Sequence, residues 1–231
     1  MGVEGIGARV TRKEDKRFLT GKGRYTDDMT VPGMKHAAFV RSPHAHARIR
    51  SIDVAEAQAM PGVIGVLAGK QLLDDGIGNI ICGWMIHSKD GSPMKMGAWR
   101  PLAVDTVRYV GDAVAIVVAD SVEEARDAAE KVVIDYEVLD AVVHAVDALQ
   151  PGAPQLHPEA ANNLIFDWEI GDSAAADAAI AAAAHVTEIK ILNNRLSPNP
   201  MEPRSTLGIY DSSEDHYTCY TTSQNPHVAR L

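Results

Sequence analysis

A glutamine that follows a predicted strand has the chemistry to contact a metal-bound oxygen. Gln224 lies in the stretch TTSQNPHVARL, directly after residues 217–222, whose β-branched and aromatic side chains predict a strand. A carboxamide donates and accepts hydrogen bonds without changing the local charge, so it suits a metal-oxo or carbonyl group. From residue type and position alone, a glutamine that contacts only solvent is the favoured interpretation.

A short helix is predicted directly after this glutamine. Ser223 or Asn225 is expected to cap it, with Pro226 just inside the first turn, where the missing N–H costs nothing. The sequence holds about one turn of this helix before Leu231. One turn does not stabilise itself, because nucleating a helix costs more than one turn returns. The helix is therefore expected to belong to a larger structure.

Two other polar pairs could carry chemistry. His44 and His46 are two residues apart, so on a strand they would share a face that a metal could use. No third ligand of evident spacing accompanies them, which favours a structural or interface role. Glu202 and Arg204 lie in the proline-flanked segment NPMEPRS and could position a ligand. A salt bridge that fixes the loop is the favoured interpretation of this second pair.

Familiar catalytic and metal-binding motifs do not occur in the sequence. Cys82 and Cys219 lack the spacing of a zinc site, and both are expected to be free thiols. GxSxG, P-loop and HExxH motifs are missing, and the glycines of GKGRYTD do not follow a predicted strand. The sequence taken alone therefore predicts no complete catalytic site.

The charge balance excludes some classes of partner. Among 231 residues, 22 are Lys or Arg and 31 are Asp or Glu, which gives a net charge of −9. A nucleic-acid binder needs a basic stripe, and an anionic membrane surface repels such a chain. The first residues lack the apolar core of a signal peptide, and no apolar run is long enough for a membrane span. The expected location is the cytoplasm.

The elements that position these residues begin with an α+β domain. Residues 69–100 are expected to form a long loop, and loops of this length are usually functional or pack on another element or a partner. The strands are predicted over residues 36–42, 47–54 and 63–67, and a short helix over residues 55–60.

The clearest unit follows this loop. Residues 112–119 are a continuous apolar run, typical of a strand buried on both faces. Asp120 or Ser121 caps the predicted helix after it, and residues 132–139 form the next strand. Strand, helix and strand in this order predict a βαβ unit or a split version of one.

A proline-rich linker over residues 140–165 predicts a domain boundary. An alanine-rich helix follows, capped by Asp172 or Ser173 and ending near Ala184, because alanine has the highest helix propensity. Three strands are then predicted, one over residues 188–195 and two within residues 206–223. The last two form a hairpin that turns at Ser212-Ser213-Glu214-Asp215.

Several segments, taken in order, resemble the molybdenum hydroxylases. The sequence is most similar to the large, molybdopterin-binding subunit of the xanthine dehydrogenase, aldehyde oxidase and carbon monoxide dehydrogenase group, over residues 5–231. The segments that carry the resemblance are IGARVTRKEDKRFLTGKGRYTDD, AAFVRSPHAHARIRSID, MPGVIGVL, RYVGDAVAIVVADS and TTSQNPH.

This resemblance implies an α+β fold in two domains. Residues 1–17 would form an N-terminal arm and residues 18–139 the α/β hammerhead domain of the family. Residues 140–162 would form a linker, and residues 163–231 the beginning of an incomplete molybdopterin-binding domain.

The resemblance also implies a role for Gln224. In this family a glutamine in the same strand-to-helix turn hydrogen-bonds an oxo ligand of a molybdopterin-type molybdenum cofactor. Family members hydroxylate a carbon or oxidise carbon monoxide, and they pass electrons to iron–sulfur clusters and FAD on partner subunits or domains. The catalytic glutamate and the glycine-rich loop of the family are not found in this sequence. No catalytic set is therefore complete in this chain, and Gln224 is its one expected cofactor contact.

Three explanations of the stop at Leu231 remain open at this stage: a shortened protein, one part of a subunit completed by a second chain, or the product of a decayed gene. The favoured function is the N-terminal part of an aldehyde, purine, other heterocycle or carbon monoxide oxidising subunit, catalytic only when completed. The alternative is a non-catalytic module that uses the hammerhead domain to bind a partner. A small metal-binding protein that uses His44 and His46 is the weakest hypothesis.

Overall fold

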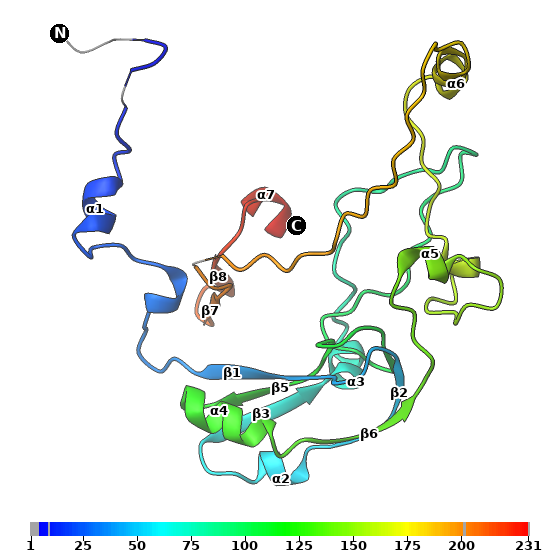
Figure 1. Ribbon diagram of the computed structural model, residues 1–231. Helices are drawn as coiled ribbons and strands as arrows, with labels where there is room; N and C mark the ends of the chain where they lie inside the picture. Colours follow the sequence, from blue (N-terminus) through cyan, green and yellow to red (C-terminus); the bar gives the residue numbers. More distant parts are fainter. Residues whose placement is uncertain (1–4, 9, 201, 231) are drawn as a thin grey trace. The chain divides into compact units, whose positions relative to one another are not determined.

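The computed structural model describes residues 5–8, 10–200 and 202–230 (Figure 1). Its contacts divide the chain into two units. The first contains residues 33–187, and the second contains the described parts of residues 1–32 and 188–231. The structure mixes helices and strands, as the α+β prediction requires. Among the described residues, no helix has both the length and the apolar character needed to cross a membrane.

Two three-stranded antiparallel sheets form the centre of the first unit. In the first sheet, β5 (Ala113–Ala119) lies between β1 (His36–Arg41) and β3 (Val63–Ala68). The predicted strands over residues 36–42, 63–67 and 112–119 are thus confirmed, with ends that differ by one residue.

In the second sheet, β2 (Ala47–Asp53) lies between β4 (Thr106–Val107) and β6 (Val133–Val138). The predicted strands over residues 47–54 and 132–139 correspond to β2 and β6. Strand β4 was not predicted from the sequence, because its two residues form a strand only through their pairing with β2.

Strand β5 supplies side chains to both hydrophobic cores of this unit. Val114 packs with Ala47 and Val107, whereas Val117 packs with Val66 and Ala128. Residues an odd number of positions apart point to opposite faces of a strand. The expected burial of both faces of β5 is therefore confirmed.

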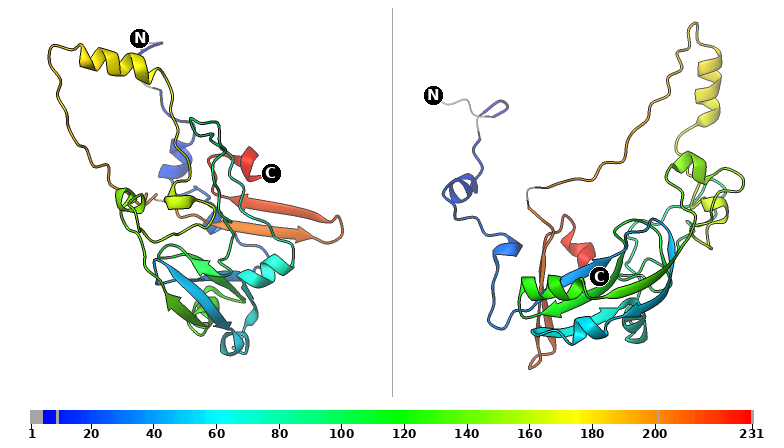
Figure 2. Two further views of the ribbon diagram at one scale, coloured as in Figure 1. Left: turned by 90° about the vertical axis from the view of Figure 1, so that its right-hand side faces the viewer. Right: turned by 60° about the horizontal axis from the view of Figure 1, so that its bottom comes forward.

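Helix α4 (Val122–Ala129) covers the sheet formed by β1, β5 and β3 (Figures 1 and 2). Of the two predicted caps, Ser121 is the one observed, because its side chain accepts a hydrogen bond from the Glu124 N–H at 3.2 Å. The Ser121 hydroxyl also donates to the Glu124 carboxylate at 2.9 Å. The buried residues of this helix are Ala125 and Ala128, two of the apolar positions in its sequence.

The predicted βαβ unit is wrong in its topology. Strand β5 belongs to the β1–β5–β3 sheet, and β6 belongs to the β4–β2–β6 sheet, so α4 connects two different sheets. Their pairings are antiparallel throughout. The order of elements along the chain was correct, but the choice of pairing partners is made by contacts between residues distant in sequence.

The shorter helices fill the connections of this unit. The predicted helix over residues 55–60 is observed as α2 (Ala55–Gln58). Helix α3 (Gly69–Asp74) occupies the start of the predicted 69–100 loop, so the expectation of an irregular segment is wrong there. The predicted linker contains α5 (Ala145–Ala148) and η2 (Ala161–Asn163).

The rest of the long loop joins the segment that follows the linker. The Lys89 N–H donates to the Asp167 carbonyl at 2.7 Å, and their side chains form an ion pair at 2.8 Å. The Lys95 N–H donates to the Ile165 carbonyl at 3.0 Å. The long loop thus packs on another segment of the chain, one of the possibilities that its length left open. All three tryptophans of the chain, at positions 84, 99 and 168, are exposed in these segments.

The alanine-rich helix is observed as α6 (Ser173–Ala181), three residues shorter than predicted. Asp172 caps it by accepting a hydrogen bond from the Ala175 N–H at 2.9 Å. The helix packs no buried residue. The residues at which this helix begins and ends are therefore set by its cap and by the helix propensity of its alanines.

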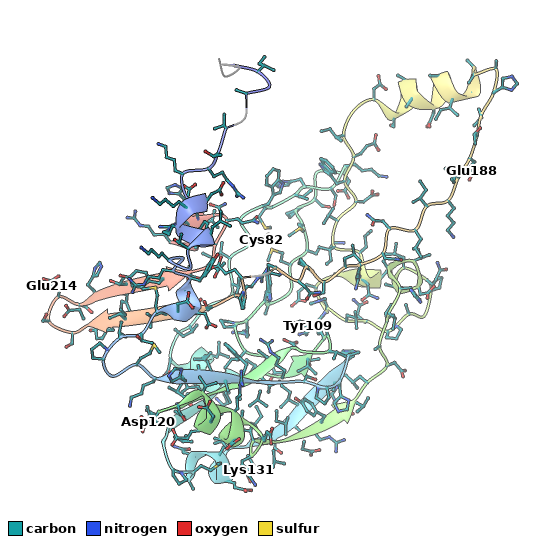
Figure 3. All side chains as sticks on the ribbon, turned by 60° about the vertical axis from the view of Figure 1, so that its left-hand side comes forward. Cys82, Tyr109, Asp120, Lys131, Glu188 and Glu214 are labelled. Carbon is teal, nitrogen blue, oxygen red and sulfur yellow. The ribbon has the colours of Figure 1, made fainter. Side chains whose placement is uncertain are left out.

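The second unit contains a hairpin of β7 (Thr206–Asp211) and β8 (His216–Thr221), which confirms the predicted pair of strands. Glu214 lies in the connecting turn (Figure 3). The unit also holds α1 (Asp15–Leu19), η1 (Thr26–Asp28) and α7 (Pro226–Ala229).

The strand predicted over residues 188–195 is wrong for this structure. Residues 188–200 are irregular and exposed, and within the described chain they form no backbone hydrogen bond. The alternation of Ile189 and Ile191 with Glu188 and Lys190 suits a strand, but no neighbouring strand pairs with this segment.

Candidate functional site

Gln224 lies in the bend between β8 and α7, as the sequence predicts. Its side chain is exposed, and within the described residues its carboxamide makes no hydrogen bond. Both its donor and its acceptor therefore remain available to a group outside this chain.

Two hydrogen bonds from neighbouring side chains define the turn around Gln224. The Asn225 N–H donates to Ser223 Oγ at 3.1 Å, which closes a small turn with Gln224 at its centre. The Val228 N–H donates to Asn225 Oδ1 at 3.3 Å, so Asn225 is the cap of α7. Pro226 occupies the first turn as predicted, because that position needs no N–H donor.

The hairpin holds the strand end that leads into this turn. The hydroxyls of Thr206 and Thr221 lie 3.0 Å apart across the two strands, and the Thr222 N–H donates to the Ser205 carbonyl at 3.3 Å. Farther along the hairpin, the rings of Tyr210 and Tyr217 pack with their centroids 4.6 Å apart. Cross-strand pairs of this kind fix the register of a hairpin and so the residue at which β8 ends.

The structure does not support a metal site at His44 and His46. Both residues precede β2 instead of sharing a face of a strand. His46 is 7% exposed, and its Nδ1 lies 2.7 Å from the Asp140 carbonyl. The His44 ring packs edge-on against Tyr136, with centroids 5.0 Å apart. Within the described residues, no group of three or more His, Cys, Asp or Glu side chains could hold a metal ion.

The remaining candidate residues are the pair Glu202 and Arg204 and the two cysteines. Glu202 and Arg204 form no salt bridge in the described part of the chain, so the favoured interpretation of this pair is wrong. Cys82 and Cys219 are free thiols, as predicted. The Cys82 thiol donates a weak hydrogen bond to the Trp84 carbonyl at 3.3 Å.

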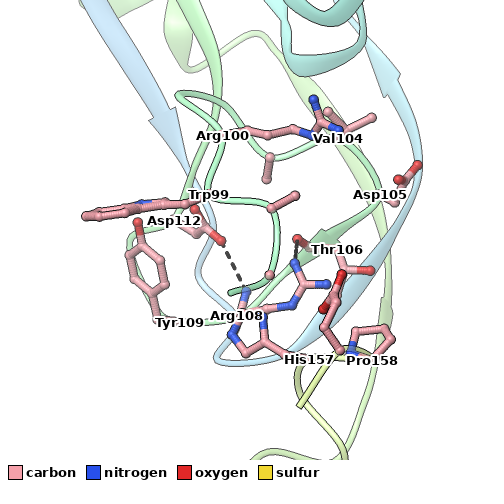
Figure 4. Close-up of a pocket in the computed structure, with 14 residues that line it drawn as sticks. Trp99, Arg100, Val104, Asp105, Thr106, Arg108, Tyr109, Asp112, His157 and Pro158 are labelled. Carbon is pink, nitrogen blue, oxygen red and sulfur yellow. Dashed lines mark hydrogen bonds between the residues drawn. The ribbon is translucent and has the colours of Figure 1, made fainter. Parts of the chain in front are cut away.

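The structure also contains a cavity of about 440 Å³ that the sequence did not reveal (Figure 4). Its wall consists of residues from the 97–112 segment and from residues 157–159. Arg108 joins the two segments, because its Nε donates to the Leu156 carbonyl at 2.8 Å. Its backbone N–H donates to the Asp112 carboxylate at 3.1 Å. No sequence motif spans the roughly 50 residues between these segments, so only the fold brings them together.

Two titratable groups in this wall are perturbed mainly by burial. Burial lowers the pKa of His157, and the nearby positive charge of Arg108 lowers it further, so the ring is neutral at pH 7. The His157 Nδ1 is buried, and within the described residues it has no hydrogen-bond partner. Burial and the Asp112 carboxylate raise the pKa of Tyr109, which keeps its hydroxyl protonated.

The cavity wall carries charges of both signs. Arg100 and Arg108 face a space also lined by Asp105, Asp112 and Glu159, so the wall selects neither an anion nor a cation. Its side chains include no nucleophile hydrogen-bonded to a base among the described residues. The cavity therefore supports no reaction by itself, and Gln224 remains the best-supported candidate for contact with a reacting group.

Two family models match this chain. Residues 20–140 match the model described as aldehyde oxidase and xanthine dehydrogenase, a/b hammerhead domain. Residues 156–231 match the model described as molybdopterin cofactor-binding domain. Gln224 and its turn lie within the second match.

Curated relatives match over almost the whole chain. The carbon monoxide dehydrogenase large chain of Hydrogenophaga pseudoflava is 36% identical, and the match covers 100% of this chain and 29% of that protein. The nicotine 6-hydroxylase large subunit of Paenarthrobacter nicotinovorans is also 36% identical, over 98% of this chain and 27% of that protein. This chain thus spans less than a third of the length of these relatives.

Solved structures also align with most of this chain. A Cu,Mo-CO dehydrogenase aligns with a TM-score of 0.82 at 35% identity, over 99% of this chain and 29% of that chain. Quinoline 2-oxidoreductase from Pseudomonas putida 86 aligns with a TM-score of 0.82 at 36% identity, over 95% of this chain and 27% of that chain.

Proposed function

Since the chain belongs to the aldehyde oxidase and xanthine dehydrogenase family of molybdenum enzymes, we propose that it forms the N-terminal part of the large subunit of a molybdenum hydroxylase or dehydrogenase. The whole enzyme would oxidise an aldehyde, a purine or other heterocycle, or carbon monoxide. The observation that carries the proposal is the free carboxamide of Gln224 inside the segment that matches the molybdopterin cofactor-binding domain.

The proposed division of the chain follows the composition of its segments. Residues 1–17 form an arm, residues 18–139 a hammerhead domain, residues 140–162 a linker and residues 163–231 the first part of the cofactor domain. The proline content of the linker and the two family matches, over residues 20–140 and 156–231, support this division.

The residues of this chain fit the cofactor at one point. The carboxamide of Gln224 offers a neutral donor and a neutral acceptor, and neither is occupied within the described chain. The cofactor, when bound, supplies the redox chemistry of the reaction. Gln224 would hold and orient it through a hydrogen bond from the turn that follows β8. One neutral side chain does not activate water, so turnover requires groups from outside this chain.

The proposed partners follow from the same premise. The rest of the large subunit, on this polypeptide or on a second one, would complete the cofactor domain, and iron–sulfur and flavin subunits or domains would accept the electrons. The relatives carry names such as large chain and large subunit, which supports an assembly of several chains. We place the assembly in the cytoplasm, where the free thiols of Cys82 and Cys219 would stay reduced.

The test is a comparison of variants in the assembled enzyme isolated from its native cells. Gln224→Ala should lower the rate of substrate oxidation roughly five-fold or more, since a hydrogen bond to a charged or strongly polar group contributes about 1–3 kcal/mol. Gln71→Ala, which removes the same group from α3, is the matched control. An unchanged rate in Gln224→Ala would remove the role of this residue. An assembly without molybdenum would favour a partner-binding module instead.

A further inference from the structure

We infer that Asn225 is a positioning residue, whose side chain caps α7 and thereby fixes the end of the turn that presents Gln224 to its ligand. This inference rests on the proposed function for the identity of that ligand. The geometry itself is local, because it concerns the connection between β8 and α7 alone.

Gln224 does not fix its own direction. Its carboxamide makes no hydrogen bond among the described residues, and its backbone lies in a bend. The direction of this side chain therefore depends on the residues on either side of it. Ser223 acts from one side by accepting the Asn225 N–H at 3.1 Å, a bond that spans Gln224.

Asn225 acts from the other side through α7. This helix has four residues, Pro226–Ala229, too few to stabilise themselves. Its side-chain cap is the bond from the Val228 N–H to Asn225 Oδ1 at 3.3 Å. The backbone carbonyl of Asn225 also accepts from the Ala229 N–H at 3.1 Å. Asn225 thus contributes its backbone N–H to the turn around Gln224. Its side chain and its carbonyl accept hydrogen bonds within α7.

The chemistry of the cap determines which substitutions preserve it. The bond to Val228 uses only the oxygen of the Asn225 side chain, and aspartate presents an equivalent oxygen at the same distance from the backbone. Alanine presents none. Asn225→Asp should therefore keep the cap of α7, whereas Asn225→Ala should weaken it and keep only the backbone bond to Ser223 Oγ.

The direct test is nuclear magnetic resonance of the full chain, with the backbone amides of Gln224 and Val228 and the Gln224 carboxamide as probes. In Asn225→Ala the population of the capped turn should fall about five-fold, as expected for loss of a helix cap. The Val228 amide should exchange faster with solvent, and the Gln224 resonances should move toward unfolded values. In Asn225→Asp the exchange rate of the Val228 amide and the Gln224 resonances should stay near those of the unmodified chain.

A second capped helix provides the control. Asp172→Ala removes the same type of bond, from the Ala175 N–H, at the start of α6. It should alter the resonances of α6 and leave Gln224 unchanged. Unchanged Gln224 and Val228 resonances in Asn225→Ala would overturn the inference. A shift of Gln224 in Asp172→Ala would also count against it, because the effect would then not be local.

The assembled enzyme separates this inference from the proposed function. Asn225→Ala should lower kcat with little change in KM, and Asn225→Asp should restore it. The double variant Gln224→Ala/Asn225→Ala should be no slower than Gln224→Ala alone, because Asn225 acts through Gln224. If Gln224→Ala keeps its full rate, the proposed role of Gln224 fails. The magnetic resonance experiment would then still test whether Asn225 stabilises the turn. If the double variant is slower than Gln224→Ala alone, Asn225 has another role and the inference fails.

Discussion

A single methyl group at Gly69 should destabilise the first unit. Gly69 begins α3 and is buried. A Cβ at this position would lie 2.3 Å from the Ala103 carbonyl oxygen and 2.9 Å from the Leu102 carbonyl oxygen. Both atoms belong to the backbone, so no side chain can rotate away. The Ala103 N–H also donates to the Ala113 carbonyl at 2.7 Å, which ties this backbone to the start of β5.

The size of the effect follows from these distances. Ordinary contact begins at 3.4 Å, so the backbone at Ala103 would have to move by about 1 Å. Overpacking of this kind costs about 1–3 kcal/mol. Replacing glycine by alanine returns about 0.4–1 kcal/mol by restricting the unfolded chain. The net loss for Gly69→Ala is therefore about 1 kcal/mol, and the urea midpoint should fall by roughly 0.5 M.

The assay is urea unfolding of the full chain followed by far-ultraviolet circular dichroism, with Gly65→Ala as the control. Gly65 lies in β3, and a Cβ there would meet nothing within 4 Å. The control should match the unmodified protein or be slightly more stable. If Gly69→Ala unfolds at the same urea concentration as Gly65→Ala, the close approach of α3 to Ala103 does not exist in solution.

Three further substitutions test other parts of the first unit. Asn163→Gly keeps the positive φ of 57° but removes three hydrogen bonds between the Asn163 side chain and the backbone of residues 148–156. The free energy of unfolding in urea should therefore fall by about 2 kcal/mol. An unchanged urea midpoint would show that these bonds do not form. Burial lowers the pKa of His157 in the folded chain, so the unfolded chain binds a proton at a higher pH than the folded chain does. The free energy of unfolding should therefore fall as the pH drops below about 6.5. His157→Gln should lack this component of the pH dependence, and identical curves would contradict the burial. His46→Ala leaves the Asp140 carbonyl without its partner, so the melting temperature should fall while metal content by mass spectrometry stays constant; loss of bound metal would instead restore the metal-site hypothesis.

The elements that the sequence predicted well have local causes. The run DAVAIVVA predicts a buried strand from its composition, and Asp172 predicts a helix start because a carboxylate caps free N–H groups. The hairpin follows from the polar turn between two β-branched segments. Each of these signals lies within about a dozen residues, so no distant contact is needed to decide it.

The features that sequence reasoning missed depend on distant partners. The two residues of β4 are a strand only because β2 pairs with them, and residues 188–195 have a strand pattern without any pairing strand. The choice between two sheets for β5 and β6 is likewise made by tertiary contacts. The cavity around Arg108 needs a segment nearly 50 residues away.

The candidate site also combines features that the sequence predicts with features that it does not. The place of Gln224 at the end of a strand and before a proline-containing helix was predictable from residue types alone. The role of Gln224 was not, since the same pattern suits a solvated glutamine, and the proposal for it depends on the family. The choice of Asn225 over Ser223 as cap of α7 needed the structure, because both residue types are good caps.

The unpaired segment over residues 188–200 has a consequence for proteolysis. A protease must draw its substrate into an extended conformation, and a segment without backbone hydrogen bonds needs no prior unfolding. Lys190 and Arg195 lie in this segment and are sites for trypsin. By contrast, most Lys and Arg residues of the first unit lie in or beside its sheets and helices. In the isolated chain, brief digestion should therefore cut at these two positions before it cuts within the first unit, and a partner strand that pairs with the segment should protect both.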